Sequence, residues 1–392
     1  MVLFIFRKRD PEGKMFVDLQ ESREQIDKID SQIVELFERR MRVASNVADY
    51  KMATGKPVFD RERENQKIEK LSDMTEDVFN KKCVAELFTQ IMAMSRKLQY
   101  KKLETASEDS MLERYEVVDR LASENARVVY QGVPGAYSHE AMTGYFGSGV
   151  NSVNVESFRE AMQKVASGEA DYGVIPIDNS SAGMVSDTYD LLQEYSNYIV
   201  AETFLKIEHC LLVKPGADIK GIKRVYSHPQ ALMQCAKFLD MHKGWVRESY
   251  PNTAMSAKKI AEENDFEQAA IGSPNCAKEY GLEIAARGIN SASANTTRFI
   301  IVSSRRAFVR NASKVSICFE IDHRAGSLYG ILSHIMFNGL NMTKIESRPI
   351  PEHNWEFRFF IDFDGNLADA GVRNALRGIA EESNALKILG NY

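Results

Sequence analysis

The chain has 392 residues, of which 44% are hydrophobic and 27% are charged, and its formal net charge is −5. This composition is typical of globular proteins, and the length corresponds to two or three domains. The negative net charge excludes the overall basic field that recruits nucleic acid, although a local basic pocket stays possible.

Cysteine and histidine usage argues against disulfides and metals. The five cysteines are odd in number and form no CxxC pair, which indicates reduced thiols in a cytoplasmic protein. The seven histidines show no metal-ligand spacing, so we expect neither a metal nor a cofactor. The apolar residues 1–6 are too short for a membrane span or a signal peptide, and we expect a short strand or a disordered lead there.

Residues 16–104 predict an all-α domain. They contain no strand pattern and a single glycine, Gly55, which ends a first predicted helix over 19–52. A second helix begins near Asp60, where several carboxylates suit the positive end of a helix dipole. A third helix is predicted over about 77–102.

The first helix carries cations on its apolar face. At about 100° per residue, a group of apolar residues falls within roughly 60° of Ile33, and we expect it to form a buried stripe. These residues are Ile26, Ile29, Leu36, Phe37, Ala44 and Val47. Arg40 and Lys51 fall in the middle of the stripe, and Arg23 falls at its edge. Long cations sometimes cover apolar surface with their charges in water, but two central cations favour an anionic ligand.

The spacing of two arginines restricts how they act. Arg23 and Arg40 lie about 26 Å apart along one straight helix, so a small ligand cannot contact both. Either they serve different ends of the helix, or a second, antiparallel copy brings its Arg23 to Arg40. The second arrangement predicts a dimer with shared sites.

Three segments, "REQIDKIDSQIVELFERRMRVASNVADYK", "KPVFDRERE" and "SRKLQ", resemble the all-helical chorismate mutases over about residues 18–102. The resemblance assigns to the substrate site Arg23 of a partner chain, Arg40, Lys51, Asp60, Arg63, Glu64, Ser95 and Gln99. In it the arginines bind the two carboxylates of chorismate, Lys51 and Gln99 bind the ether oxygen, and Glu64 holds the ring hydroxyl. The rearrangement is pericyclic, so such a site needs only to hold a compact conformer and to stabilise charge on the ether oxygen.

Residues 105–126 are polar and charged, and we interpret them as a helical connector. From residue 127 short apolar strands alternate with helices, which predicts an α/β domain with a mostly parallel sheet over 127–303. Four turns, "QGVPGAYS", "IPIDNSSAG", "SHPQALMQC" and "NTTRF", carry small or hydroxylated residues. Helix capping explains any one of them, but together they indicate a cleft at the carboxyl ends of the strands. Their glycines do not match a nucleotide-binding motif.

These turns resemble those of prephenate dehydratases, which have two α/β lobes like a solute-binding protein and a site between them. The resemblance, most specific at "TRF", assigns to that site Asp178, Asn179, Ser180, Gln234, Thr297 and Arg298. Thr297 is the candidate donor to the hydroxide that leaves together with carbon dioxide, either directly or through a relay. Arg298 faces a carboxylate or packs. Asp178 stands where the family pattern usually has glutamate.

Residues 314–392 predict the order βαββα, and the apolar "LKILG" is a candidate last strand, as in a ferredoxin-like α+β fold. The segments "RAGSLYGIL" and "IESRPIP" resemble the phenylalanine-binding segments of ACT regulatory domains. The resemblance assigns to an allosteric site Gly326, Ser327, Leu328, Glu346, Ser347, Arg348 and Pro349. The alternative is a purely structural dimerisation unit.

Together the resemblances imply a bifunctional, cytoplasmic, feedback-regulated enzyme of phenylalanine biosynthesis. It would rearrange chorismate to prephenate, dehydrate and decarboxylate prephenate to phenylpyruvate, and respond to L-phenylalanine. The implied state is a homodimer or a larger homo-oligomer without nucleic-acid or membrane partners. Two alternatives stay open: a dehydratase that prefers arogenate, and a non-catalytic amino-acid sensor.

Overall fold

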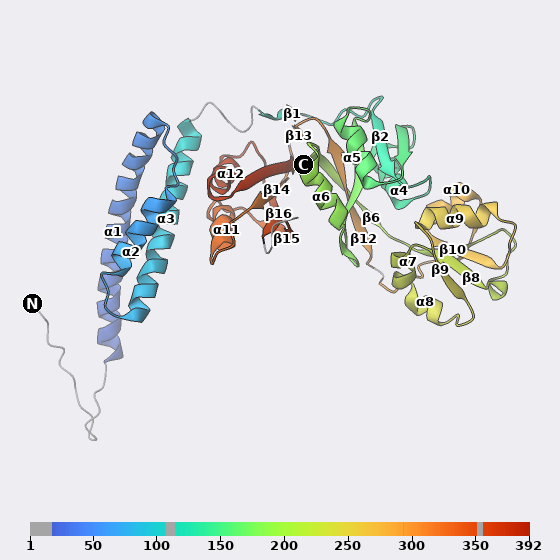
Figure 1. Cartoon of the computed structure of the whole chain (residues 1–392), viewed down its shortest axis with the longest axis horizontal. Coiled ribbons are helices and arrows are strands. Elements are labelled where there is room, and N and C mark those ends of the chain that lie inside the picture. Colours follow the sequence, from blue (N-terminus) through green and yellow to red (C-terminus); the bar gives the residue numbers. More distant parts are fainter. Residues whose placement is uncertain (1–17, 107–113, 293, 351–355) are drawn as a thin grey trace, which may run out of the picture. The chain divides into compact units, whose positions relative to one another are not determined.

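The computed structural model describes residues 18–106, 114–292, 294–350 and 356–392 (Figure 1). The strand or lead expected at residues 1–6 lies outside the described residues. The chain divides into two compact units, a helical one and a larger one built on β-sheets. No helix in the described part of the chain is long and apolar enough to cross a membrane.

The helical unit contains α1 (Leu19–Thr54), α2 (Arg61–Ser72) and α3 (Val78–Ala106), which confirms the three predicted helices. The Asp18 side chain begins α1 by accepting hydrogen bonds from two backbone N–H groups, and Gly55 ends it in the left-handed conformation at φ 66°. Asp60 caps α2 by accepting from the backbone N–H of Arg63 at 3.1 Å. Both α1 and α2 pack on α3.

The apolar stripe of α1 is not buried within the single chain, so that prediction is wrong for the chain alone. Ile26, Ile29, Ile33 and Leu36 are 54–63% exposed, and Phe37 and Ala44 are only half-buried. The reason is a shortage of partners, because a 36-residue helix here has only α3 and the 12-residue α2 to cover it. The stripe therefore remains available to another surface.

The helical-connector prediction is also wrong for the described part of 105–126 that follows α3. Glu116–Val118 form strand β1, which pairs in parallel with β13 (Ala307–Val309). The β-branched residues Val117 and Val118 suit a strand, and Tyr115 packs edge-on against Phe308.

The first lobe of the larger unit is a sheet in the order β3-β2-β4-β12-β6, with α4, α5 and α6 packed on it. Its strands are β2 (Arg127–Gln131), β3 (Asn151–Val155), β4 (Tyr172–Asn179), β6 (Tyr198–Lys206) and β12 (Thr296–Ser303), with the short β5 (Gly183–Met184) beside β4. Its helices are α4 (Tyr137–Phe146), α5 (Phe158–Ala166) and α6 (Ser186–Glu194). Strand β2 runs parallel to β3 and β4, whereas β12 runs antiparallel to β4 and β6.

The second lobe is a separate sheet in the order β11-β7-β10-β8-β9. Its elements are β7 (Cys210–Val213), the 3-10 helix η2 (Ile219–Gly221), β8 (Arg224–Ser227), α7 (Pro229–Gln234), α8 (Ala236–Asp240), β9 (Val246–Ser249), α9 (Thr253–Glu262), β10 (Gln268–Gly272), α10 (Pro274–Tyr280) and β11 (Glu283–Ala286). The chain crosses between the lobes after β6 and returns before β12. The strands next to these crossings run antiparallel to their neighbours, so both sheets are mixed and the mostly parallel sheet was wrongly predicted.

A βαββαβ unit follows and confirms the predicted ferredoxin-like topology, including the last strand. It contains β14 (Lys314–Glu320), α11 (Ser327–Phe337), β15 (Met342–Pro349), β16 (Phe357–Asp364), α12 (Ala370–Glu382) and β17 (Ala385–Asn391), with the strand order β15-β16-β14-β17. Strand β17 lies beside β6, so the first-lobe sheet continues into this unit (Figure 1). Gly390 makes this contact, and a Cβ there would lie 2.0 Å from the carbonyl oxygen of Ile199.

Candidate active sites

In the helical unit, polar residues of α1 and α3 meet across their contact. Arg40 donates hydrogen bonds to the Ser95 hydroxyl and to the carbonyl of Ile91. The Gln99 amide nitrogen donates to the carbonyl of Ser95 at 3.2 Å. Ser95 and Gln99 are 5% and 6% exposed, and within the described structure the Gln99 Oε1 atom is buried without a hydrogen-bond partner. A buried oxygen without a partner indicates a place where another group is expected.

The two stripe cations share an acidic neighbour. Burial lowers the pKa of Arg40 and of Lys51, and the charge of Glu64 opposes that effect at both. Lys51 donates to the carbonyl of Val58 at 2.6 Å. Glu64 also pairs with Arg96, whose side chain is 9% exposed. Arg96 was not among the predicted residues, although it lies inside the quoted "SRKLQ".

The structure thus gathers five predicted residues, Arg40, Lys51, Glu64, Ser95 and Gln99. Asp60 and Arg63 stand at the start of α2, where Asp60 acts as its cap and Arg63 is exposed. Arg23 is exposed near the opposite end of α1 and is not brought to the others within one chain.

The larger unit has a cavity of about 300 Å³ between its lobes. Residues from β4 and β12 line one side, residues from α7 and the start of α9 line the other, and Ile207 and His209 line it from the crossing between the lobes. Asn179, Gln234 and Thr297 reach it, as predicted. Apolar walls with a few polar groups are typical of small-molecule sites.

A directed set of hydrogen bonds orients Asn179 and Thr297. The backbone N–H groups of Ser181 and Ala182 donate to Asn179 Oδ1 at 2.9 and 2.8 Å. Because these groups can only donate, the amide nitrogen of Asn179 points the other way, and it donates to Thr297 Oγ1 at 2.9 Å. Thr297 accepts this bond, and among the described residues its own hydroxyl proton has no acceptor, so it is available to a ligand. Ser180 instead ties β4 to β12 through Ala294 and Thr296.

Asp178 and Arg298 face away from the cavity. Asn179 lies opposite Thr297, and Asp178 lies opposite Arg298, on the antiparallel strands β4 and β12. Successive strand residues point to opposite faces of a sheet, so the first pair reaches the cavity and the second pair does not. The Asp178 carboxylate accepts hydrogen bonds from Tyr189 at 3.1 Å and from Arg298 at 3.3 Å, and it pairs with Lys344.

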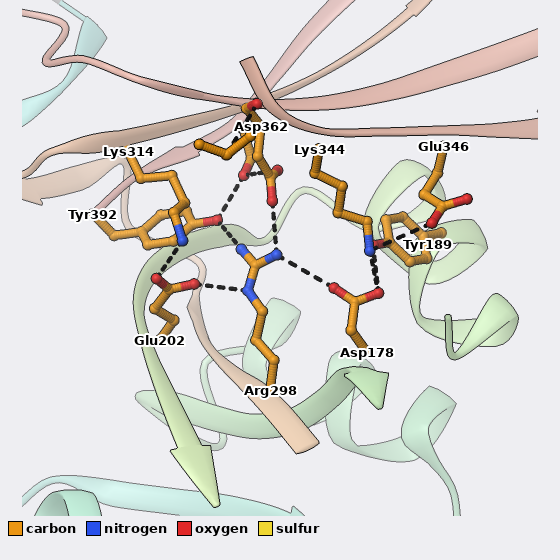
Figure 2. A network of polar contacts seen from close by, with 11 residues as sticks. Asp178, Tyr189, Glu202, Arg298, Lys314, Lys344, Glu346, Asp362 and Tyr392 are labelled. Atoms are coloured by element: carbon orange, nitrogen blue, oxygen red, sulfur yellow. Dashed lines mark hydrogen bonds and ion pairs between the residues drawn. The ribbon is translucent and has the colours of Figure 1, made fainter. Parts of the chain in front are cut away.

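Arg298 is the centre of a buried ionic network, which Figure 2 shows. It binds Glu202 and Asp362 at 2.7 Å each and the Tyr392 hydroxyl at 2.6 Å. Burial by itself would lower the pKa of Arg298, but Tyr392 and the surrounding acids raise it, so the guanidinium stays charged. Lys314 pairs with Glu202, and Lys344 reaches both Asp178 and Glu346. The network therefore joins the first lobe to the ferredoxin-like unit.

The predicted effector residues lie on two elements. Gly326 precedes α11 in the left-handed conformation at φ 81°, and Ser327 and Leu328 begin that helix. Along β15, residues Lys344, Glu346 and Arg348 are half-buried, whereas Ser347 and Pro349 are exposed. Arg348 pairs with Asp190 of α6. The half-buried face of the "ESRP" strand is thus the one that contacts the first lobe.

Sequence reasoning missed two residues of the cavity network, Asn295 and His209. Asn179 donates to Asn295 Oδ1 at 2.8 Å, and Asn295 donates in turn to Gln234 Oε1 at 3.2 Å. His209 lies 2.8 Å from the same Gln234 oxygen. Asn295 heads the quoted "NTTRF" turn, which was a usable signal, whereas His209 stands beside no motif.

Comparisons with known proteins match the two regions that contain these sites. The sequence model described as chorismate mutase type II matches residues 22–100, and the one described as prephenate dehydratase matches residues 128–307. The bifunctional chorismate mutase/prephenate dehydratase of Escherichia coli (strain K12) is 32% identical over 377 residues, which cover 94% of this chain and 95% of that protein.

Two further relatives each match about two thirds of the chain. The arogenate dehydratase/prephenate dehydratase 2, chloroplastic, of Arabidopsis thaliana is 38% identical over 278 residues, covering 68% of this chain and 72% of that protein. The crystal structure of prephenate dehydratase in complex with L-Phe from Arthrobacter aurescens is 30% identical, with a TM-score of 0.63. It covers 68% of this chain and 89% of that one.

The ionic network generates a stability prediction. Arg298→Met leaves three buried carboxylates without their common cation, and we expect it to lower the free energy of unfolding by about 3–5 kcal/mol. The matched control is Arg305→Met, because Arg305 is 60% exposed and pairs with the exposed Glu116. The Arg305→Met change should lower the free energy of unfolding by at most about 1 kcal/mol. Urea unfolding of both variants measures the difference, and equal losses would contradict a buried network.

Proposed function

Because the chain belongs to the bifunctional chorismate mutase/prephenate dehydratases, we propose that its three regions perform and regulate consecutive steps. Residues 16–104 form the mutase domain, 127–303 form the dehydratase domain, and 314–392 form an ACT domain that binds L-phenylalanine. The product of the first reaction is the substrate of the second. The observation that carries the dehydratase assignment is the oriented Asn179–Thr297 pair at the cavity.

For the mutase step, we propose that Arg40 and Arg63 bind carboxylates of chorismate, and that Glu64 holds the ring hydroxyl. Lys51 and Gln99 stabilise the negative charge that develops on the ether oxygen. Lys51 donates only, whereas the side-chain amide of Gln99 presents its nitrogen or its oxygen according to its rotamer. Burial strengthens these contacts, since a low dielectric surrounding weakens charge screening.

We propose that the mutase site is completed by a second chain. The exposed apolar stripe of α1 supports this, because soluble proteins rarely leave so long an apolar face uncovered. An antiparallel partner helix would cover the stripe and bring Arg23 of the partner to Arg40. The expected assembly is a homodimer with two shared mutase sites.

For the dehydratase step, the leaving hydroxyl of prephenate accepts the free proton of Thr297. The bond from the ring carbon to the carboxylate breaks, its electron pair enters the ring, and the carbon–oxygen bond breaks as the ring becomes aromatic. Carbon dioxide and water leave, and phenylpyruvate remains. Thr297 takes a proton back from water. Asn179 and Gln234 position the substrate, and Asp178 and Arg298 support the strand ends from the other face.

The cavity favours prephenate over arogenate. Arogenate carries an ammonium group where prephenate has a keto oxygen, and a buried ammonium needs a carboxylate partner. Among the described residues that line the cavity there is no aspartate or glutamate. Membership of an enzyme family also sets aside the non-catalytic sensor.

We propose that L-phenylalanine acts through the strand that carries Glu346 and Arg348. Lys344 on the same strand pairs with Asp178, and Asp178 precedes Asn179, which binds Thr297. An effector changes activity only if it binds two states of the enzyme unequally. Movement of β15 would change the contacts of Lys344 and hence the end of β4.

Two substitutions should separate the activities. Lys51→Ala should lower the turnover of chorismate by about 10²–10³-fold and leave turnover of added prephenate intact, and Thr297→Ala should do the reverse. Thr297→Ser retains the hydroxyl, and Lys56→Ala removes an exposed lysine nearby, so both controls should stay active. Chorismate loss and phenylpyruvate formation measure the two steps. Loss of both activities in either variant would contradict separate sites.

Mixing inactive chains tests the shared mutase site. Arg23→Ala and Lys51→Ala homodimers should both be inactive, because each lacks one residue at every site. After the two proteins are unfolded and refolded together, half of the dimers are mixed, and each mixed dimer has one intact site. We therefore expect about a quarter of the wild-type activity to return. No recovery would show that Arg23 acts within its own chain.

The proposed route of regulation predicts a desensitised variant. Lys344→Met keeps an apolar side chain of similar length but removes the positive charge that pairs with Asp178. It should raise the concentration of L-phenylalanine that gives half-inhibition by about 5-fold or more. Lys223→Met, which breaks an exposed ion pair with Glu267, should leave inhibition unchanged. Dehydratase rates at increasing L-phenylalanine measure the effect, and calorimetry shows whether the effector still binds. Normal inhibition of Lys344→Met would exclude this route.

A further inference from the structure

We propose that His209, held by Tyr137, is a positioning residue for the dehydratase reaction, which orients the amide of Gln234 so that its nitrogen faces the substrate. The inference rests on the dehydratase site proposed above. His209 lies in none of the quoted motifs, and Tyr137 lies in the quoted "QGVPGAYS" turn, where the resemblance assigns it no role. His209 lies on the crossing between the lobes and is 2% exposed.

The direction of the hydrogen bonds follows from one fixed point. Backbone N–H groups donate to Asn179 Oδ1, so the Asn179 nitrogen donates to Asn295 Oδ1 at 2.8 Å. The Asn295 nitrogen must then donate to Gln234 at 3.2 Å, and the atom that accepts is Oε1. Asn295 is 1% exposed, so water does not replace these bonds. The Gln234 oxygen therefore points into the protein.

His209 holds the same oxygen from the other side. Its Nε2 atom lies 2.8 Å from Gln234 Oε1, and since that oxygen only accepts, Nε2 carries a proton. Burial lowers the pKa of His209, which favours the neutral ring with Nδ1 as an acceptor. Burial raises the pKa of Tyr137, so its hydroxyl keeps its proton, and that proton is shared between two acceptors, His209 Nδ1 at 2.9 Å and the carbonyl of Glu208 at 3.0 Å. The tautomer of His209 therefore follows from the accepting oxygen of Gln234, and Tyr137 holds the opposite end of the ring in place.

Two donors on Oε1 leave the Gln234 nitrogen with both of its protons. Within the described part of the chain this nitrogen has no hydrogen-bond acceptor, and Gln234 lines the cavity. It is therefore set to donate to a carboxylate or keto oxygen of the substrate. Without His209, the amide of Gln234 would turn more freely and present its oxygen to an anionic ligand, which repels it.

The first test compares two substitutions of His209. His209→Gln retains an amide nitrogen near the place of Nε2, whereas His209→Leu removes the donor. We expect His209→Leu to lower kcat/KM for prephenate about tenfold or more, and His209→Gln to retain most of it. Tyr137→Phe keeps the aromatic ring but removes the hydroxyl, and it should lower kcat/KM for prephenate a few-fold. Equal loss in the leucine and glutamine variants, or none in either, would overturn the inference.

A double-mutant cycle shows whether His209 acts through Gln234. If it does, adding His209→Leu to Gln234→Ala should lower kcat/KM for prephenate no further. If His209 had a merely structural role, the second substitution would lower kcat/KM again. Mutase turnover of the same chains and thermal unfolding report on folding. Should His209→Leu fail to fold, His209→Asn, whose shorter amide does not reach Gln234, replaces it in the cycle. Thr297→Ala distinguishes failure of the proposed dehydratase site from failure of the His209 inference. Full dehydratase activity of Thr297→Ala would refute the proposed site. An inactive Thr297→Ala together with a fully active His209→Leu would refute only the role of His209.

Discussion

The pairing of β4 with β12 is the constraint on which the larger unit depends. Thr297 lies opposite Asn179, and Arg298 lies opposite Asp178. Since neighbouring strand residues face opposite sides, one pair of strand ends serves the cavity on one face and the ionic network on the other. A slip of one residue would exchange the two sets, so the register is fixed on both sides at once. Hydrogen bonds hold one face, and ion pairs hold the other.

The ionic network favours a defined geometry more than it favours stability. Buried ion pairs cost nearly as much in lost hydration as their attraction returns, and apolar substitutes are often as stable. What the network adds is direction, because the planar guanidinium of Arg298 donates to three carboxylates and to the Tyr392 hydroxyl in fixed directions. Such an arrangement has few alternatives of similar energy. It is thus suited to joining the strand ends at the cavity to the ferredoxin-like unit in one fixed arrangement.

Local signals predicted the helices and the strand alternation well, because caps, glycines and periodic apolar residues lie in the sequence beside the elements they determine. The central cations Arg40 and Lys51 also pointed to a site. The exposure of Ile26, Ile29 and Ile33 was not predictable in this way, because periodicity shows an apolar face but not whether the chain has an element to cover it. The mixed sheets and His209 were missed for a related reason: both arise where the chain crosses between lobes, which brings together residues distant in sequence. Asp178 and Arg298 lie inside motifs that were predicted to line the cleft. Only the strand register, in which successive residues point to opposite faces of the sheet, shows that their side chains point away from the cavity.

Gly390 restricts how the ferredoxin-like unit can be joined to the first lobe. The two halves of the long sheet meet at one residue pair, and the space there holds a hydrogen atom but no carbon. A single added methyl group at this position would clash with the backbone of Ile199 and push the two halves apart, although Gly390 itself does not line the cavity. If the ferredoxin-like unit regulates the dehydratase as proposed, a one-base change of the glycine codon would disturb that regulation without replacing a residue that lines the cavity.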